Sequence, residues 1–374
     1  MSEALFIGLI SGTSRDGVDA VLVRFGDHRC ELLASRCRPY PEALSGWLTA
    51  VLEQPQRTPI DQLGALHTEL AQVFADATHE LLDVAGVPAR AVRAIGSHGQ
   101  TIRHRPDLPH GFSLQLGDPG TLAVLTGIPV VADFRTADMA AGGQGAPLAP
   151  AFHRWAFASP EENRAVLNLG GIANVTLLPR EGPVLGFDTG PANALLDLWI
   201  REQRGEPYDD GGRWAAGGNV DQALLRACLQ EAFFQRPPPK STGLELFNRR
   251  WLAARLAAAG ERTSPRDVQA TLAELTAITV ARPLQAAGPP ERLLVCGGGV
   301  HNPDLLARIA ARLPGTVVES SDCLGIAPDW VEACAFAWLA RERLAERPGN
   351  LPQVTGARVA VPLGGVYLPA AGAL

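Results

Sequence analysis

The sequence predicts an α/β protein with two lobes. Strand-like apolar runs alternate with helical periods along most of the chain, which is typical of α/β folds. The 374 residues exceed what one hydrophobic core usually supports, so two lobes are expected. A strand, a glycine turn and a second strand occur near residue 10 and again near residue 170. We therefore expect lobe I at 1–135, with the tail 347–374 as a segment that can return to it, and lobe II at 136–346.

The individual elements follow from local periodicity and from Gly and Pro punctuation. Strands are expected at 5–10, 18–25, 92–97, 112–116, 129–133, 164–169, 173–178, 184–188 and 292–296. Helices are expected at 61–85, 192–204, 219–235, 265–287, 302–312 and 328–346. Loops are expected at 103–111 and 207–218, followed by a Pro- and Gly-punctuated tail at 348–374.

Charge and composition exclude several classes of partner. The formal net charge is −6 and the basic residues are dispersed, which argues against a nucleic-acid or polyanionic membrane partner. Apolar runs are interrupted well before membrane-spanning length, and the start has no basic secretory segment, so we expect a cytoplasmic protein. The six cysteines lack C-x-x-C spacing, which indicates reduced thiols and no cysteine metal site.

The first glycine turn is the most informative feature. Ser11, Gly12, Thr13 and Ser14 stand between two strand-like runs, and their hydroxyl and peptide groups can donate to an anion. Asp16 and Asp19 follow, placed to hold a metal ion. The turn lacks the lysine and the following helix of a P-loop. It therefore predicts a phosphate-binding hairpin, with an ordinary Gly/Asp hairpin as the alternative.

Three later turns extend this pattern. Gly170 and Gly171 join two strands where lobe II would begin. Asp188 ends a strand before a helix, where it can face a reacting centre while the helix end attracts phosphate; N-capping by Asp188 or Thr189 is the alternative. The glycines 297–299 follow another strand and predict a shelf for adenine and ribose.

Lys240 is the only lysine among 33 Lys and Arg residues. An ammonium is a compact point charge, whereas a guanidinium is a planar fork, so a tight polar pocket can accept one and exclude the other. We therefore hypothesise that the segment 240–243 lies at a ligand cleft. Chance retention on a solvated turn is the alternative.

Taken in order, these motifs resemble the anhydro-N-acetylmuramic acid kinases, a family of the actin, sugar-kinase and heat-shock ATPase superfamily. The matching segments span nearly the whole chain: 11–14 with Asp16, Gly17 and Asp19, then 95–104, 131–135, 141–147, 168–174, 186–188, 239–243, 296–299 and 332–340. The resemblance implies an actin-like fold in which each lobe is a mixed sheet flanked by helices, with ATP and sugar between the lobes. Ile10, Arg15, Thr189 and Ala192 depart from the family pattern, and Arg15 adds a charge beside the phosphate turn.

The resemblance implies that ATP and water convert 1,6-anhydro-N-acetylmuramic acid to N-acetylmuramic acid 6-phosphate and ADP, a step of peptidoglycan recycling. Asp188 would be the base for the attacking water, and Glu332 a second acid near the sugar. The nucleotide-binding set would be Ser11, Gly12, Thr13, Ser14, Arg15, Asp16, Gly17, Val18, Asp19, Gly170, Gly171, Lys240, Gly297, Gly298 and Gly299. Mg²⁺ would be held by Asp16 or Asp19, directly or through water. The sugar-binding set would be Ser97, His98, Gln100, Thr101, Asp133, Arg135 and Asn174, with structural roles as the alternative for His98 and Arg135. A homodimer is a family expectation.

Three other classes remain as alternatives. A kinase of an ordinary sugar hydroxyl would share the nucleotide motifs but would need no water. A glycoside-cleaving enzyme would use two carboxylates without a nucleotide. A non-catalytic actin-like module would hold ATP without a sugar acceptor.

Overall fold

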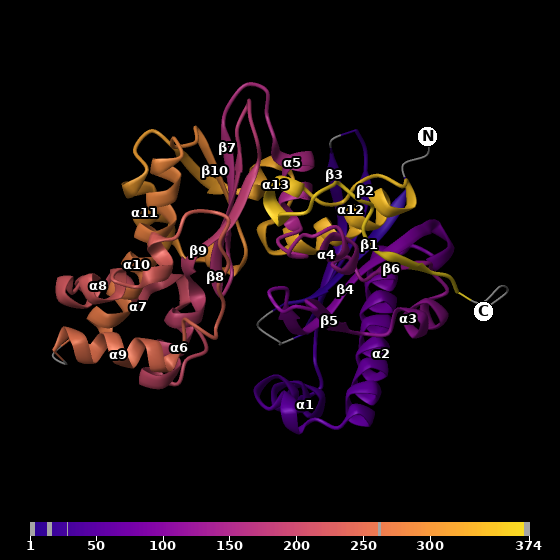
Figure 1. The fold of residues 1–374 in the computed structure, drawn as a ribbon, viewed down its shortest axis with the longest axis horizontal. Helices are drawn as coiled ribbons and strands as arrows, with labels where there is room; N and C mark the ends of the chain where they lie inside the picture. Colours follow the sequence, from indigo (N-terminus) through magenta and orange to yellow (C-terminus); the bar gives the residue numbers. More distant parts are fainter. Residues whose placement is uncertain (1–3, 13–16, 28, 261–262, 370–374) are drawn as a thin grey trace. The chain divides into compact units, whose positions relative to one another are not determined.

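The computed structural model describes residues 4–12, 17–27, 29–260 and 263–369. The chain divides into two compact units, one made of residues 1–156 with 330–374 and the other of residues 157–329 (Figure 1). This division differs from the one we expected at two places, because 136–156 and 330–346 belong to the first unit. The second place matters for function, since it includes the helix that carries Glu332.

The first unit is built on a mixed sheet, of which the described residues form seven strands. Their order is β12-β6-β4-β1-β2-β3, and β5 also pairs with β4. Strands β1 and β2 are antiparallel, with Ile10 opposite Asp19, so the predicted first hairpin is confirmed for its strands. The strands are β1 (Leu5–Ser11), β2 (Gly17–Phe25), β3 (Cys30–Pro39), β4 (Val92–Arg105), β5 (Phe112–Leu116), β6 (Val130–Ala132) and β12 (Gly365–Tyr367).

Three strand predictions in this sheet need correction. The sequence analysis expected only a tail at 348–374, which contains β12, paired with β6. The sequence analysis missed β3, a partly exposed strand in which charged residues such as Glu31, Arg36 and Arg38 obscure the apolar pattern. It also began a loop at residue 103, whereas β4 continues to Arg105, because its end pairs with β5. The antiparallel partner supplies hydrogen bonds that local sequence does not reveal.

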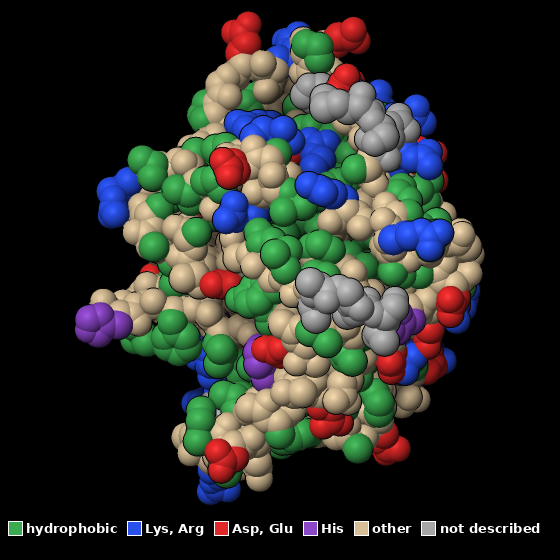
Figure 2. Space-filling model, turned by 90° about the vertical axis from the view of Figure 1, so that its right-hand side faces the viewer, with side chains coloured by type: hydrophobic (Ala, Val, Ile, Leu, Met, Phe, Trp, Pro, Cys, Tyr) green, Lys and Arg blue, Asp and Glu red, His purple; other side chains and the backbone are tan. Residues whose placement is uncertain are grey.

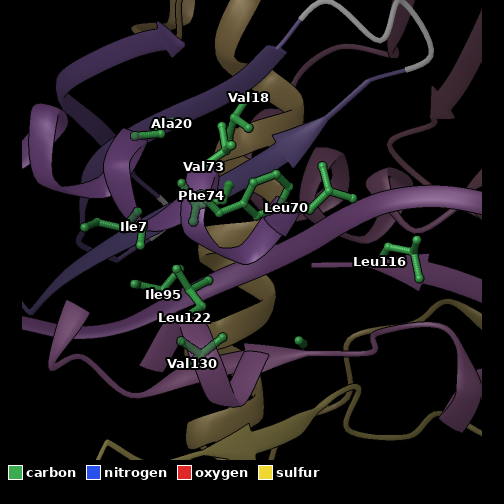
Figure 3. Packing of buried hydrophobic residues seen from close by; sticks show 14 of the residues in the cluster. Ile7, Val18, Ala20, Leu70, Val73, Phe74, Ile95, Leu116, Leu122 and Val130 are labelled. Atoms are coloured by element: carbon green, nitrogen blue, oxygen red, sulfur yellow. The ribbon is translucent and has the colours of Figure 1, made fainter. Parts of the chain in front are cut away.

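Helices cover both faces of this sheet. They are α1 (Glu42–Glu53), α2 (Ile60–Ala85), α3 (Pro119–Thr126), α4 (Thr136–Ala140), α5 (Ala149–Phe157), α12 (Val331–Leu344) and α13 (Pro352–Thr355), with 3₁₀ turns η1 (Pro55–Arg57) and η2 (Ala89–Ala91). Side chains from α2, including Leu70 and Phe74, meet Ile7 of β1 and Val130 of β6 in a fully apolar core (Figure 3). The predicted helix 61–85 is confirmed as α2.

Helix α12 lies on the opposite face, directly against the sheet backbone. A Cβ atom added to Gly8 of β1 would lie 1.9 Å from the carbonyl oxygen of Ala333, and one added to Gly96 of β4 would lie 2.0 Å from that of Phe336. Since successive residues of a strand face opposite sides, Gly8 faces α12 while Ile7 faces α2. These two glycines therefore set how closely Glu332 approaches the sheet.

The second unit contains a smaller mixed sheet, which has five strands in the described chain. The order is β11-β10-β7-β8-β9; β7, β8 and β9 are antiparallel, and β10 is parallel to both β7 and β11. The predicted second hairpin is confirmed, with Leu169 opposite Ala173 across the Gly170–Gly171 turn. The strands are β7 (Arg164–Leu169), β8 (Ile172–Leu178), β9 (Leu185–Pro191), β10 (Arg292–Cys296) and β11 (Val317–Ser320).

Helices of the second unit form two apolar clusters, one of them against this sheet. They are α6 (Asn193–Arg204), α7 (Arg213–Ala216), α8 (Gln222–Leu229), α9 (Arg249–Ala259), α10 (Pro265–Ala286) and α11 (Pro303–Arg312). The 3₁₀ turns are η3 (Asp210–Gly212), η4 (Ala232–Gln235), η5 (Gly298–His301), η6 (Ser321–Leu324) and η7 (Pro328–Trp330).

The predicted helix 219–235 is too long, because α8 ends at Leu229. Glu231 has an extended backbone, and its carboxylate accepts hydrogen bonds from the Phe233 N–H, the Trp251 indole and the Arg255 guanidinium. Those tertiary partners interrupt a segment whose local periodicity is helical.

The remaining features concern the surface charges, the helix lengths and the cysteines. The face drawn in Figure 2 carries basic and acidic side chains interspersed among apolar ones. Among the described residues, no helix combines the length and apolar character needed to span a membrane. Cys30, Cys228, Cys296 and Cys334 are buried, whereas Cys37 and Cys323 are exposed.

Candidate active site

The described part of the first glycine turn is joined to β4. The Ser11 hydroxyl donates to Oε1 of Gln100 at 2.6 Å, and both side chains are buried. Gly17 and Val18 are buried at the start of β2, while Asp19 keeps partial exposure. Thr13, Ser14, Arg15 and Asp16 lie outside the described residues. One predicted nucleotide ligand and one predicted sugar ligand thus meet in a single hydrogen bond.

Arg135 links β4 to the loop that follows α4. Its Nη2 lies 2.8 Å from Nε2 of His98, and its Nη1 donates to the carbonyl oxygen of Gly145 at 2.8 Å. Burial, followed by the positive charge of Arg135, holds the pKa of His98 well below its ordinary value. His98 is therefore a neutral partner of Arg135.

Two predicted sugar ligands in the first unit carry buried polar atoms that are not hydrogen-bonded to any described residue. These atoms are Nε of Arg135 and Oγ of Ser97, whose side chain is only 1% exposed. Leaving a buried donor unpaired costs about 1–3 kcal/mol, and a bound ligand removes that cost when it supplies the missing partner. Both therefore mark places where a bound polar group would restore the lost hydrogen bonds.

Glu332 and Asp19 form an acidic pair near Arg135. Desolvation by the surrounding protein, followed by the charge of Asp19, raises the pKa of Glu332, and Arg135 opposes this shift. The Glu332 side chain is nevertheless exposed to solvent, although the residues on either side of it, Val331 and Ala333, are buried. Within the described chain no group of three or more metal-ligating side chains occurs. Carboxylate oxygens are the donors that Mg²⁺ prefers, so Asp19 has the right chemistry to hold it.

Two further predicted sugar ligands already have protein partners. The Thr101 hydroxyl accepts a hydrogen bond from the Gln115 amide at 3.2 Å. Asp133 is exposed and accepts from the Thr136 hydroxyl at 2.7 Å and from its N–H at 3.3 Å. Asp133 also has a φ of 58°, a left-handed conformation that is strained for a residue with a Cβ.

Asp188 lies on β9 of the second unit, opposite Asn174 of β8. Its Oδ2 accepts the N–H of Thr242 at 2.8 Å, and no hydrogen bond from a described residue to Oδ1 is present. Desolvation raises the pKa of Asp188 to about 6. The charge of Glu245 also raises this pKa, whereas the hydrogen bond from Thr242 and the charge of Lys240 lower it. A carboxylate with this pKa is ionised at neutral pH and still basic enough to take a proton.

The turn at Gly170 and Gly171 supports the start of α6. The carbonyl of Gly170 accepts the N–H of Asn193, and the carbonyl of Gly171 accepts those of Ala192 and Ala194. The first two N–H groups of α6, those of Asn193 and Ala194, are therefore already bonded within the protein, whereas the attraction of phosphate to this helix end stays a prediction. Capping by Asp188 or Thr189 is wrong, since α6 has no side-chain cap.

The glycines 297–299 connect β10 to α11. A Cβ atom on Gly297 would lie 2.3 Å from Oδ1 of Asn168, and one on Gly299 would lie 2.5 Å from Cβ of Leu169. Gly298 is exposed and would meet no atom within 4 Å. Two of the glycines are thus needed for packing against β7, and the middle one presents open backbone.

Lys240 lies in the same neighbourhood as Asp188. Its carbonyl oxygen accepts the Asp188 N–H at 3.0 Å, and its Nζ donates to the carbonyl oxygen of Phe233 at 3.3 Å. Desolvation lowers the pKa of Lys240, while the charge of Asp188 raises it.

The sequence analysis missed two residues that organise these groups. Thr242 lies inside a motif that it singled out, yet its N–H contact with Asp188 spans 54 positions and leaves no local signal. Asp138 is fully buried and accepts from the Gly145 N–H, Asn350 Nδ2 and Thr355 Oγ1 at 2.8, 2.6 and 2.7 Å. An acidic residue between two apolar ones, Ala137 and Met139, was the available signal.

Comparisons with known proteins cover almost the entire chain. Residues 4–369 match the family model of anhydro-N-acetylmuramic acid kinase. A protein of that name from Xanthomonas campestris pv. campestris strain 8004 is 55% identical over 367 residues, covering 97% of each chain. One from Saccharophagus degradans is 48% identical over 373 residues, covering 99% of this chain and 100% of that one. Component A of the (R)-2-hydroxyglutaryl-CoA dehydratase of Acidaminococcus fermentans is 12% identical with a TM-score of 0.50, covering 92% of this chain and 100% of that one, a likeness of fold alone.

Proposed function

The chain belongs to the anhydro-N-acetylmuramic acid kinase family, and from this we propose that it uses ATP and water to convert 1,6-anhydro-N-acetylmuramic acid to N-acetylmuramic acid 6-phosphate and ADP. Water attacks the anomeric carbon, and the bond from that carbon to the bridging O6 breaks. The freed O6 takes the γ-phosphoryl group. The reaction returns a cell-wall sugar to metabolism in peptidoglycan recycling.

The observation that carries the sugar assignment is that two of the predicted sugar ligands in the first unit each carry a buried polar atom with no hydrogen bond to a described residue. The substrate bears a lactyl carboxylate and an N-acetyl group, which call for a cation and for neutral hydrogen-bond partners. Arg135 supplies a guanidinium with a buried Nε–H, and Ser97 a buried hydroxyl, neither bonded to a described residue. His98 orients Arg135. Further contacts are assigned to Gln100, Thr101, Asp133 and Asn174.

Asp188 is the proposed base. Its Oδ1 accepts the proton of the attacking water, while Thr242 holds Oδ2. A positioned base of this kind contributes roughly 10²- to 10⁴-fold in rate. Glu332 is assigned to orienting the sugar and water, supported by its solvent contact and by its charge interactions with Asp19 and Arg135.

Phosphoryl transfer requires alignment and charge neutralisation more than covalent help. We assign the phosphates to the turn between β1 and β2, whose described members include Ser11 and Gly12, and assign contacts with the rest of the nucleotide to the backbone at Gly170, Gly171 and Gly298. Mg²⁺, when bound, neutralises phosphate charge, and Asp19 together with Asp16 would hold it. The protein is proposed to act as a cytoplasmic homodimer on a small-molecule sugar, without a nucleic-acid or membrane partner.

A coupled assay of ADP release tests this function. The protein is given ATP with 1,6-anhydro-N-acetylmuramic acid and, separately, with N-acetylmuramic acid, N-acetylglucosamine and glucose. We expect turnover with the anhydro sugar and, in ¹⁸O water, one label at the anomeric position of the product. Turnover only with a non-anhydro sugar, without label, would identify an ordinary sugar kinase. ATP binding without turnover on any sugar would identify a non-catalytic module.

A further inference from the structure

The segment 240–242 is hydrogen-bonded to both the backbone and the carboxylate of Asp188, the proposed base. The Asp188 N–H donates to the Lys240 carbonyl at 3.0 Å, and the Thr242 N–H donates to Oδ2 of Asp188 at 2.8 Å. These two bonds restrict both the main chain and the side-chain torsion of Asp188. Together they select which carboxylate oxygen is left to accept a proton.

The ammonium group of Lys240 is also anchored. Its Nζ donates to the Phe233 carbonyl at 3.3 Å and lies 4.7 Å from the centroid of the Phe233 ring. Phe233 is itself 2% exposed and packs against Phe234 and Phe247. An ammonium held by a rigid buried aromatic residue is a fixed point charge.

The charges that face Asp188 come from one short stretch of chain. Lys240 stabilises the ionised carboxylate, Glu245 opposes ionisation, and Asn174 on the neighbouring strand is neutral. Arg236 is the other charge that acts on Lys240. Desolvation of Asp188 favours the protonated acid, and the Thr242 hydrogen bond, together with the Lys240 ammonium as the one cation among these charges, favours the ionised carboxylate.

We propose that Lys240 is a positioning residue for the catalytic base: its carbonyl orients Asp188, and its ammonium keeps the carboxylate ionised at working pH, in place of the nucleotide contact that the sequence suggested. This inference rests on the proposed role of Asp188 as the base.

The test compares pH profiles of Lys240→Met, Lys240→Arg and Arg236→Met with that of the wild-type protein. Removing the ammonium should raise the pKa of the base and move the acid limb of kcat/KM to higher pH. We expect the Lys240→Met loss at pH 5.5 to exceed its loss at pH 8.5 by roughly three- to tenfold, since one pH unit changes the ionised fraction tenfold. Because Lys240→Arg retains the positive charge, we expect the acid limb of its kcat/KM profile to stay near the wild-type position. Arg236→Met, a matched charge removal on the same loop, also leaves it there.

Two outcomes overturn the proposal. A rise in the KM for ATP of Lys240→Met with an unmoved acid limb identifies Lys240 as a nucleotide ligand. Unchanged pH profiles and KM values in all three variants identify a solvated loop lysine. A ¹³C NMR titration of the Asp188 carboxyl, assigned from the Asp188→Asn spectrum, measures the pKa without turnover. It also shows that each variant is folded, and separates failure of this inference from failure of the proposed function.

Discussion

Nη2 of Arg135 lies 2.8 Å from Nε2 of His98. A guanidinium can only donate, so this imidazole nitrogen accepts and the ring carries its proton on Nδ1. Nδ1 lies 3.0 Å from the carbonyl oxygen of Gly99, which takes that proton in a hydrogen bond. The buried, neutral His98 thus accepts a hydrogen bond from Arg135 and orients it, and Arg135 is a predicted sugar ligand.

His98 is therefore expected to remain neutral throughout the working pH range. Its ¹⁵N shifts should stay those of the Nδ1–H tautomer down to pH 5, because burial and Arg135 both lower its pKa. His98→Gln, whose amide oxygen can accept from Arg135, should retain more sugar affinity than His98→Leu. Protonation of His98 near pH 6.5, or equal sugar KM values for both variants, would contradict this arrangement.

Arg135→Lys keeps a positive charge but loses the fork that reaches both His98 and Gly145. We expect the KM for the anhydro sugar to rise roughly 10- to 100-fold, the cost of losing a charge-assisted hydrogen bond, and the KM for ATP to change less than twofold. As the control substrate, 1,6-anhydro-N-acetylglucosamine lacks the lactyl carboxylate. The variant should discriminate less between the two sugars. If the variant and the wild type discriminate equally between the two sugars, Arg135 does not bind the lactyl carboxylate.

Asp188→Asn should reduce turnover by roughly 10²- to 10⁴-fold while leaving ATP affinity within twofold, because the amide cannot accept the water's proton. ADP release and ATP titration measure the two effects. Asn can still offer its carbonyl oxygen to the Thr242 N–H, so folding is preserved. Turnover like that of the wild type would exclude Asp188 as the base.

The same variant should be more stable than the wild type at pH 7.5. The pKa of Asp188 is raised from 3.8 to about 6 on folding, so the native state binds the proton more tightly than the unfolded state. The wild-type protein therefore loses stability as pH rises from about 4 to about 6, and Asn does not. We expect a gain on the order of 1–3 kcal/mol at pH 7.5 that vanishes below pH 4, measured by urea unfolding.

Asp138→Ala is expected to destabilise the first unit by about 2–4 kcal/mol, since it strands three buried donors at once. It should also raise the sugar KM, because the bond from Gly145 to Asp138 supports the carbonyl that holds Arg135. Asp107→Ala, at an exposed loop position, is the control. An unfolding midpoint equal to that of the control would show that the Asp138 network contributes nothing to folding.

Local sequence predicts elements well where one face of the element is apolar and short-range signals mark its ends. Helix α2 and both glycine hairpins are of this kind. Prediction fails where a remote partner decides, as at β3, at the end of β4 against β5, and after Leu229, where Glu231 binds Trp251 and Arg255. Helix α12 was expected at the right place in the chain but in the wrong unit, because a helical period does not say which sheet it will cover.

By itself, the sequence determined the α/β alternation, the order of the glycine turns, the family and the position of Asp188 at a strand end. These depend on residue type and spacing, which act within a few residues along the chain. Only the tertiary structure decided which residues orient the site. His98 is hydrogen-bonded to Arg135, and Thr242 and Lys240 are hydrogen-bonded to Asp188. Gly8 and Gly96 let α12 approach the first sheet. Each of these relationships joins positions tens to hundreds of residues apart. Hydrogen-bond geometry and close packing, which exist only after the chain folds, therefore determine them.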